Sequence, residues 1–254
     1  MKRRSVVNAV RPAAPHVRTI YGVHAISGWL EASPTQLRQI HVGRQGSERV
    51  AAIINRAAQL GIPVQACGGE QLQELVGNVQ HQGIAAVAAP FPYVEVQPLV
   101  ARQPRLLVLA DQLNDPHNLG ALLRTAEAGG ADAVLLPKDG AVPVTSTVEA
   151  VAAGAAARVP VCRVTNVART VEWLRRQGFW TAGLVPRHGI DLFQWDMQPP
   201  LVLVVGGETG IRRLVAERCD VRVSIPMAGR ADSLNASVAA AVAIFEILRR
   251  WRAP

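Results

Sequence analysis

In the second part of the chain, short apolar segments alternate with longer segments of helical periodicity, and this alternation limits the possible folds more than any other feature. The strand candidates are 105–110, 133–136, 159–164, 180–185, 201–205 and 221–225, and the helix candidates are 118–128, 146–157, 167–177, 211–217 and 235–251. The strand candidates are mostly apolar instead of alternating, which is typical of strands buried on both faces. We therefore predict an α/β domain at 105–254 with a parallel sheet that helices cover on both sides.

A smaller α/β module precedes this domain, at residues 18–90. Helix candidates at 21–30, 48–60 and 70–76 alternate there with strand candidates at 37–42, 62–66 and 83–89. Several prolines then punctuate 91–104, which we interpret as an interdomain linker. Residues 1–17 are expected to form a disordered tail.

The formal net charge is +8, and basic side chains are concentrated at the N-terminus. The first acidic residue is Glu31, and it is preceded by Lys2, Arg3, Arg4, Arg11 and Arg18. A flexible basic arm is suited to binding an anionic polymer such as RNA. A solubilising terminus or an Arg-rich transit peptide would have the same composition, so these interpretations stay open.

Composition excludes several classes of protein. Hydrophobic residues make up 49% of the chain, which excludes wholesale disorder, and no apolar run reaches the roughly 18 residues of a membrane span. Cys67, Cys162 and Cys219 are isolated in the sequence, which argues against a disulfide scaffold or a structural zinc site and favours a reducing, cytoplasmic compartment. The 6 histidines show no metal-ligand spacing, so no metal is predicted.

In open α/β sheets, ligands bind beyond the carboxyl ends of strands, and three loops in such positions contain polar residues. The first loop runs from 111 into the helix that follows it. Asp115 or Asn118 could cap this helix, while Asn118 and Arg124 project from it as a candidate binding surface. A capped helix with a solvated arginine is the purely structural alternative.

The second loop, 206–210, follows an apolar strand and precedes a helix. Gly206 and Gly207 permit a close approach of the backbone to a ligand, and Glu208 is a candidate for orienting a hydroxyl or an amine. The loop lacks the G-x-G-x-x-G pattern of dinucleotide sites. An ordinary glycine-rich turn is the alternative.

The third loop links the last strand to the long C-terminal helix. It is long for a connection in an α/β protein, and long loops often carry function. Its polar side chains include Ser233 and Asn235. Ser233 or Asn235 can cap the helix, so capping is the structural alternative.

Taken in this order, the three loops resemble the motifs of the SpoU (TrmH) family of RNA 2′-O-methyltransferases, in the SPOUT superfamily. The matching residues are Asn118, Gly120, Ala121 and Arg124, then 206–208, and then 225–229 with 233–237. Residues 20–25 and 81–84 resemble the ribosomal-L30e-like RNA-binding domain of the large-subunit rRNA guanosine methyltransferases. The loop after Glu208 is one residue shorter than the family pattern, which leaves the equivalence of Gly210 open.

The resemblance implies a C-terminal α/β-knot domain with a deep trefoil knot, behind a smaller L30e-like domain. It implies 2′-O-methylation of a guanosine ribose in 23S rRNA, with S-adenosylmethionine as methyl donor, no metal, no membrane association, and a homodimer formed through the knotted domain. The implied donor-binding residues are Gly206, Gly207, Ile225, Met227 and Leu234. The implied catalytic residues are Asn118, Arg124, Glu208, Ser233 and Asn235.

Three alternatives stay open. A tRNA ribose methyltransferase or a resistance-type rRNA methyltransferase would carry the same motifs. A non-catalytic RNA-binding or ribosome-assembly protein could have retained the fold. A nicotinamide oxidoreductase is suggested only by the α/β pattern, and the missing G-x-G-x-x-G argues against it.

Overall fold

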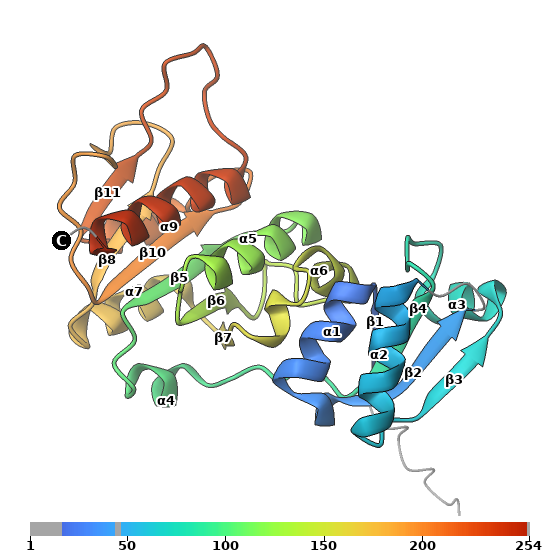
Figure 1. The fold of residues 1–254 in the computed structure, drawn as a ribbon. Helices are drawn as coiled ribbons and strands as arrows, with labels where there is room; N and C mark the ends of the chain where they lie inside the picture. Colours follow the sequence, from blue (N-terminus) through green and yellow to red (C-terminus); the bar gives the residue numbers. More distant parts are fainter. Residues whose placement is uncertain (1–16, 44–46, 253–254) are drawn as a thin grey trace, which may run out of the picture.

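The structure of this chain is a computed structural model that describes residues 17–43 and 47–252. It contains two sheets, each with its own helices, and Figure 1 shows them as two lobes. The predicted tail 1–17, apart from Val17, lies outside the described residues. No helix in the described ranges is both long enough and apolar enough to span a membrane.

The N-terminal sheet has the strand order β1-β4-β2-β3, in which β4 is antiparallel to β1 and β2, and β2 is parallel to β3. The elements are β1 (Arg18–Tyr21), α1 (Val23–Ala32), η1 (Pro34–Gln36), β2 (Leu37–Gly43), α2 (Glu48–Gln59), β3 (Val64–Cys67), α3 (Gly69–Val76) and β4 (Ile84–Ala88). The first helix begins two residues later than predicted, because Gly22 has a φ of 90° that a right-handed helix does not allow.

The C-terminal sheet has seven strands in the order β7-β6-β5-β10-β8-β11-β9, and every pair of neighbours is parallel. The strands are β5 (Leu106–Asp111), β6 (Ala133–Pro137), β7 (Val161–Val164), β8 (Trp180–Leu184), β9 (Ile190–Asp191), β10 (Leu201–Gly206) and β11 (Val221–Ser224). The helices are α5 (Pro116–Ala128), α6 (Ser146–Val151), η2 (Ala155–Ala157), α7 (Val167–Arg176), α8 (Arg213–Arg218) and α9 (Ala236–Arg252).

Helices cover both faces of this sheet. Leu106 and Val108 of β5 belong to the apolar cluster that α5 and α9 complete on one face. Leu107 and Leu109 belong to the cluster that α7 and α8 complete on the other face. The prediction of a parallel sheet buried on both sides is therefore confirmed. The trefoil knot is a property of chain threading, which strand order alone does not define, and it stays a prediction.

Two segments differ from the sequence-based expectation. The predicted linker 91–104 contains a short helix, α4 (Val96–Val100), and Val94 forms a parallel bridge with Cys162 of β7. The predicted helix 146–157 is interrupted, because Ala153 and Gly154 have positive φ values of 51° and 92°. Positive φ values end a right-handed helix, so α6 and η2 are separate elements.

Candidate functional site

The second and third motif loops, together with the segment after β8, surround one cavity of about 450 Å³ at the carboxyl ends of β8, β10 and β11. In Figure 1 the third loop rises from β11 and returns to the start of α9. The cavity is lined by Leu184, Val185, Pro186, Val205, Gly206, Gly207, Glu208, Thr209, Gly210, Ile211, Ile225, Met227, Ser233, Leu234, Asn235, Ala236 and Ala239. This is the edge at which open parallel sheets bind ligands.

The floor of the cavity requires glycine at two positions. A Cβ atom on Gly206 would lie 2.1 Å from the carbonyl carbon of Gly210, and one on Gly207 would lie 2.1 Å from the carbonyl oxygen of Gln112. The Gly210 N–H donates to the Gly207 carbonyl at 3.0 Å, and Gly210 has a φ of 81°. The short loop after Glu208 is therefore a closed turn with bare backbone facing the cavity.

An ion pair between a buried carboxylate and a half-exposed arginine fixes this turn to the neighbouring strand. Asp111 ends β5 and is fully buried, and its carboxylate accepts hydrogen bonds from the Arg212 backbone N–H at 2.9 Å and from Arg212 Nη2 at 2.6 Å. The Gly207 N–H donates to the Asp111 carbonyl at 2.9 Å. Neither Asp111 nor Arg212 was identified from the sequence as part of the site. The available signal was an aspartate at the end of an otherwise apolar strand.

A second network joins the first and third loops. Asn118 is 7% exposed, and its Oδ1 accepts hydrogen bonds from Asn235 Nδ2 at 2.9 Å and from the Ser237 hydroxyl at 3.4 Å. Asn235 Oδ1 in turn accepts from the Ser237 backbone N–H at 2.9 Å, so Asn235 caps α9. Asp115 caps α5 by accepting from the His117 N–H. Ser237 is an addition to the predicted site, although it lies within the third motif.

Two predicted residues stand apart from these networks. Glu208 is exposed and lines the cavity, whereas Arg124 is exposed on α5 and is not one of the lining residues. Arg124 lies about 9 Å along the helix axis from Asn118, at 1.5 Å per residue. Neither Glu208 nor Arg124 forms a hydrogen bond or an ion pair with another described residue. The other predicted residues therefore line the cavity or, in the case of Asn118, are hydrogen-bonded to Asn235 of its lining. Arg124 lies outside the cavity.

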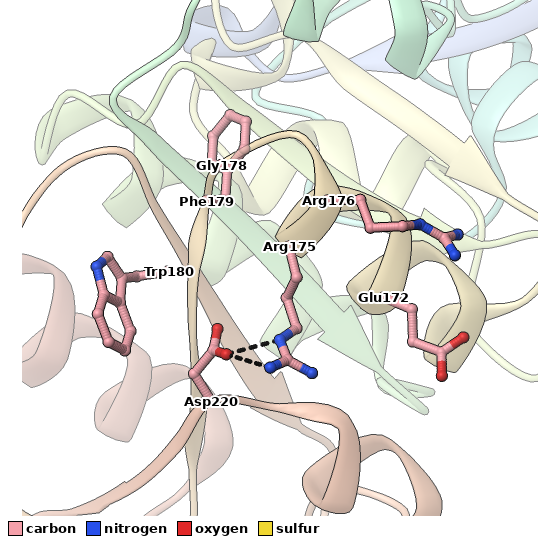
Figure 2. A pocket seen from close by; sticks show the side chains of 7 residues that line it. All are labelled: Glu172, Arg175, Arg176, Gly178, Phe179, Trp180 and Asp220. Carbon is pink, nitrogen blue, oxygen red and sulfur yellow. Dashed lines mark hydrogen bonds and ion pairs between the residues drawn. The ribbon is translucent and has the colours of Figure 1, made fainter.

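Another hollow lies at the opposite, amino-terminal edge of the sheet. Its volume is about 580 Å³. Figure 2 shows the side chains that line it, among them Trp180, the first residue of β8. Arg175 and Asp220 form an ion pair of 2.6 Å within it. None of the motif residues lines it, so the cavity lined by the second and third motif loops is the better candidate. Within the described ranges, no group of three or more His, Cys, Asp or Glu side chains is arranged to hold a metal ion.

Comparison with known families gives two matches that divide the chain as the two sheets do. Residues 105–245 match the model described as the SpoU rRNA Methylase family. Residues 19–94 match the model described as RNA 2′-O ribose methyltransferase substrate binding. The first match alone covers more than half of the chain.

Similar proteins extend over almost the whole length. The 23S rRNA (guanosine-2′-O-)-methyltransferase RlmB of Coxiella burnetii is 38% identical over 245 residues, covering 94% of this chain and 98% of the relative. The protein of the same name from Escherichia coli K12 is 40% identical, covering 91% and 98%. The crystal structure of the SpoU methyltransferase AviRb from Streptomyces viridochromogenes in complex with the cofactor AdoMet aligns with a TM-score of 0.78 at 27% identity, covering 92% of this chain and 90% of AviRb.

Proposed function

This chain belongs to the SpoU rRNA methylase family, and from that membership we propose that it transfers a methyl group from S-adenosylmethionine to the ribose 2′-oxygen of a guanosine in 23S rRNA. The observation that carries the proposal is that the second and third motif loops line one cavity at the carboxyl edge of a parallel sheet, while Asn118 of the first motif is hydrogen-bonded to Asn235 of that lining. We assign residues 105–254 to methyl transfer and 18–90 to substrate binding, with 91–104 joining them. A ribosomal RNA substrate also supports a cytoplasmic location.

The cavity has the size and lining that the methyl donor requires. Its volume of about 450 Å³ lies in the range of small-molecule sites. Gly206 and Gly207 would offer backbone groups at close approach, and Ile225, Met227 and Leu234 would offer apolar contacts. Glu208 is the only ionisable side chain among the lining residues, and its negative charge suits a cationic ligand. Bound S-adenosylmethionine would supply an activated methyl group on a sulfonium centre, so the transfer requires no metal.

The polar residues around the cavity can hold the acceptor. Asn118 Oδ1 is occupied by Asn235 and Ser237, whereas its Nδ2 has no partner among the described residues and can donate to a ribose oxygen. Ser233 and Asn235 are proposed to complete the contacts with the hydroxyl. Holding the acceptor in line with the methyl group supplies several kcal/mol, up to about 7–11 in ideal cases. Only RNA carries the 2′-hydroxyl, so ordinary DNA is not a substrate.

Arg124 is proposed to bind the phosphate of the target nucleotide and to polarise the hydroxyl. A guanidinium stays protonated at neutral pH, so it is a poor proton acceptor. Glu208 is the better candidate for the proton acceptor, because its carboxylate is exposed and lines the cavity. Holding Arg124 or Asn118 in place is the alternative role for Glu208.

We propose that a second copy of the chain covers one face of α9. Val238 and Phe245 are 48% and 47% exposed, and with the partly buried Val242 they form an apolar stripe at helical spacing. The opposite face of α9 packs against α5. Contiguous exposed apolar side chains mark interaction surfaces, and two-fold homodimers are the commonest assemblies.

The test is transfer of labelled methyl groups to RNA. Purified protein is incubated with S-[methyl-³H]adenosylmethionine and, in parallel, with a 23S rRNA transcript or with total tRNA. We expect label in the 23S transcript, and mapping by reverse transcription at limiting nucleotide concentration is expected to find it on a guanosine ribose. Label confined to tRNA would favour the tRNA alternative. Donor binding without any transfer would favour the non-catalytic alternative.

A further inference from the structure

A buried carboxylate that methyl transfer does not use lies between the two domains. Glu149 is on α6 of the methylase domain, residues 105–254, and is 1% exposed. Its Oε2 accepts a hydrogen bond from Arg18 Nε at 3.0 Å, and its Oε1 accepts one from Trp29 Nε1 at 2.7 Å. Arg18 and Trp29 both belong to the substrate-binding domain, residues 18–90. One carboxylate therefore joins β1 and α1 of the first domain to α6 of the second.

The environment of Arg18 makes this contact specific. The guanidinium lies over the Trp29 ring, 4.7 Å from its centroid, and 5.5 Å from the centroid of Phe91. Arg18 also donates a hydrogen bond to the carbonyl of Ala89. Burial raises the pKa of Glu149, and the charge and hydrogen bonds of Arg18 act against that shift. Burying a charge without its partner costs free energy. An orientation of the two domains in which Glu149 is buried but does not contact Arg18 would therefore be disfavoured.

A second contact brings the backbones of the two domains together. A Cβ atom on Gly28 of α1 would lie 2.6 Å from the Cα of Gly154, in the turn that precedes η2. The Tyr21 hydroxyl lies 3.5 Å from the hydroxyl oxygen of Thr147. Figure 1 shows α1 beside the methylase lobe at this place. The two domains thus meet through close-packed backbone as well as through Glu149.

We propose that Glu149 is a positioning residue that holds the substrate-binding domain in one orientation on the methylase domain. RNA bound by the first domain then presents one particular ribose to the cavity of the second. Glu149 acts through Arg18 and Trp29 and does not line the cavity. This inference rests on the proposed rRNA methyltransferase function, and it adds a reason why one nucleotide is selected.

The test compares three full-length variants with the wild type on a 23S rRNA transcript. Glu149→Gln removes the buried charge, and Gly28→Ala inserts a methyl group between the domains while every charge stays. Glu127→Gln is the matched control, because Glu127 forms an exposed ion pair with Arg158 at 2.7 Å in the same domain as Glu149. The measured quantity is the ratio of methyl groups at the main ribose to methyl groups at all other riboses. Partial unfolding lowers total methylation but leaves this ratio unchanged.

A second readout reports docking without any catalysis. The Trp29 indole N–H is hydrogen-bonded to buried Glu149, so its resonance in a ¹⁵N–¹H spectrum exchanges slowly with solvent in the docked state. We expect Glu149→Gln and Gly28→Ala to accelerate this exchange and to lower the methylation ratio about tenfold, since a misplacement of about 1 Å can cost up to about a hundredfold. Donor affinity should stay within about twofold in each variant, because neither residue lines the cavity.

Two results would overturn the proposal. One is an unchanged methylation ratio in both variants although Trp29 exchange has become fast. The other is fast exchange of the Trp29 indole in the wild type. If the wild type transfers no methyl group to rRNA, the proposed function fails and the positioning role fails with it, whereas slow Trp29 exchange would still establish the docked arrangement. Should Glu149→Gln not fold, Gly28→Ala alone decides the outcome.

Discussion

Asn235 Nδ2 donates a hydrogen bond of 2.9 Å to Asn118 Oδ1, which ties the residue that caps α9 to the first turn of α5. The two asparagines belong to the third and the first motif and are 117 positions apart. Because Asn118 Oδ1 also accepts from Ser237, the Asn118 amide is held with its Nδ2 available to a ligand. The first and third motifs are thus joined by hydrogen bonds next to the cavity.

We expect Asn118→Ala to reduce turnover on 23S rRNA about 10²-fold, the scale seen when one hydrogen-bond donor is removed from a reacting centre. Donor affinity should change little, because Asn118 does not line the cavity. The matched control is Asn166→Ala, since Asn166 Oδ1 accepts from the Arg169 N–H at 3.0 Å and caps α7 away from the site. Both variants should lose about 1 kcal/mol of unfolding free energy. Equal turnover in the two variants would remove Asn118 from the acceptor site.

Gly207→Ala is expected to abolish donor binding. The added Cβ would lie 2.1 Å from the carbonyl oxygen of Gln112, so the turn after β10 must move. Gly229→Ala is the matched control in the third loop, because a Cβ there meets nothing within 4 Å. Isothermal titration with S-adenosylmethionine should therefore show wild-type affinity for Gly229→Ala and no measurable binding for Gly207→Ala. Wild-type affinity in Gly207→Ala would mean that the donor does not depend on this turn.

The sequence was sufficient to predict elements whose burial is uniform along the chain. Strand β10 (Leu201–Gly206) is buried at every position and coincides with the apolar run predicted at 201–205. Strand β1 (Arg18–Tyr21) was not predicted, because its partner β4 lies far along the chain, with Arg18 opposite Ala88. Such a strand is stabilised by long-range pairing, which local periodicity does not record.

The same reason explains which parts of the site were missed. Within each motif the residues lie close together in the sequence, so each motif could be identified before its position in the fold was known. The ion pair between Asp111 and Arg212 joins residues 101 positions apart, and the contact between Glu149 and Arg18 joins residues 131 positions apart. Each of these side chains looks ordinary within its own segment, and only the fold brings the opposite charges together. The choice between Ser233 and Asn235 as cap of α9 depended on where the helix begins, and it begins at Ala236.

The proposed dimer predicts that Phe245→Ser produces a monomer. Phe245 is 47% exposed in the isolated chain, so replacing it removes apolar contact area between copies at little cost to the fold. Leu214→Ser is the matched control, because Leu214 is 53% exposed on α8 and is not part of the α9 stripe. Light scattering coupled to gel filtration should report a dimer for the wild type and for Leu214→Ser. A monomeric wild type would contradict the prediction.

Glu246 is expected to stabilise the fold in a pH-dependent way. A hydrogen bond from Arg249 lowers the pKa of Glu246 from 4.5 to about 2; burial acts in the opposite direction, and Arg250 adds to the lowering. A lowered pKa in the folded state means that the stabilisation is complete above pH 4.5 and is lost as the pH falls toward 2. Glu246→Gln should therefore melt below the wild type at pH 7, and the difference should shrink between pH 4.5 and pH 2.

The control for this experiment is Glu217→Gln, whose ion pair with Arg213 is exposed on α8. Exposed pairs contribute at most about 1 kcal/mol, so this variant should melt close to the wild type at each pH. A difference between Glu246→Gln and the wild type that stays constant down to pH 2 would show that the ion pairs with Arg249 and Arg250 are not its source.

Substitution of Arg124 is expected to change turnover without changing the stability of the fold. Its side chain is exposed and pairs with no other described residue, so Arg124→Ala should leave the melting temperature and the donor affinity unchanged. If Arg124 binds the target phosphate, turnover on 23S rRNA should fall about 10²–10³-fold, and Arg124→Lys should recover only part of it because lysine lacks the bidentate fork. The matched control is Arg176→Ala, an exposed arginine near the end of α7. Because Arg124 lies outside the cavity of the single chain, retention of turnover in Arg124→Ala would assign the phosphate contact to another residue, whereas its loss would mean that the bound RNA or the second copy brings the phosphate to α5.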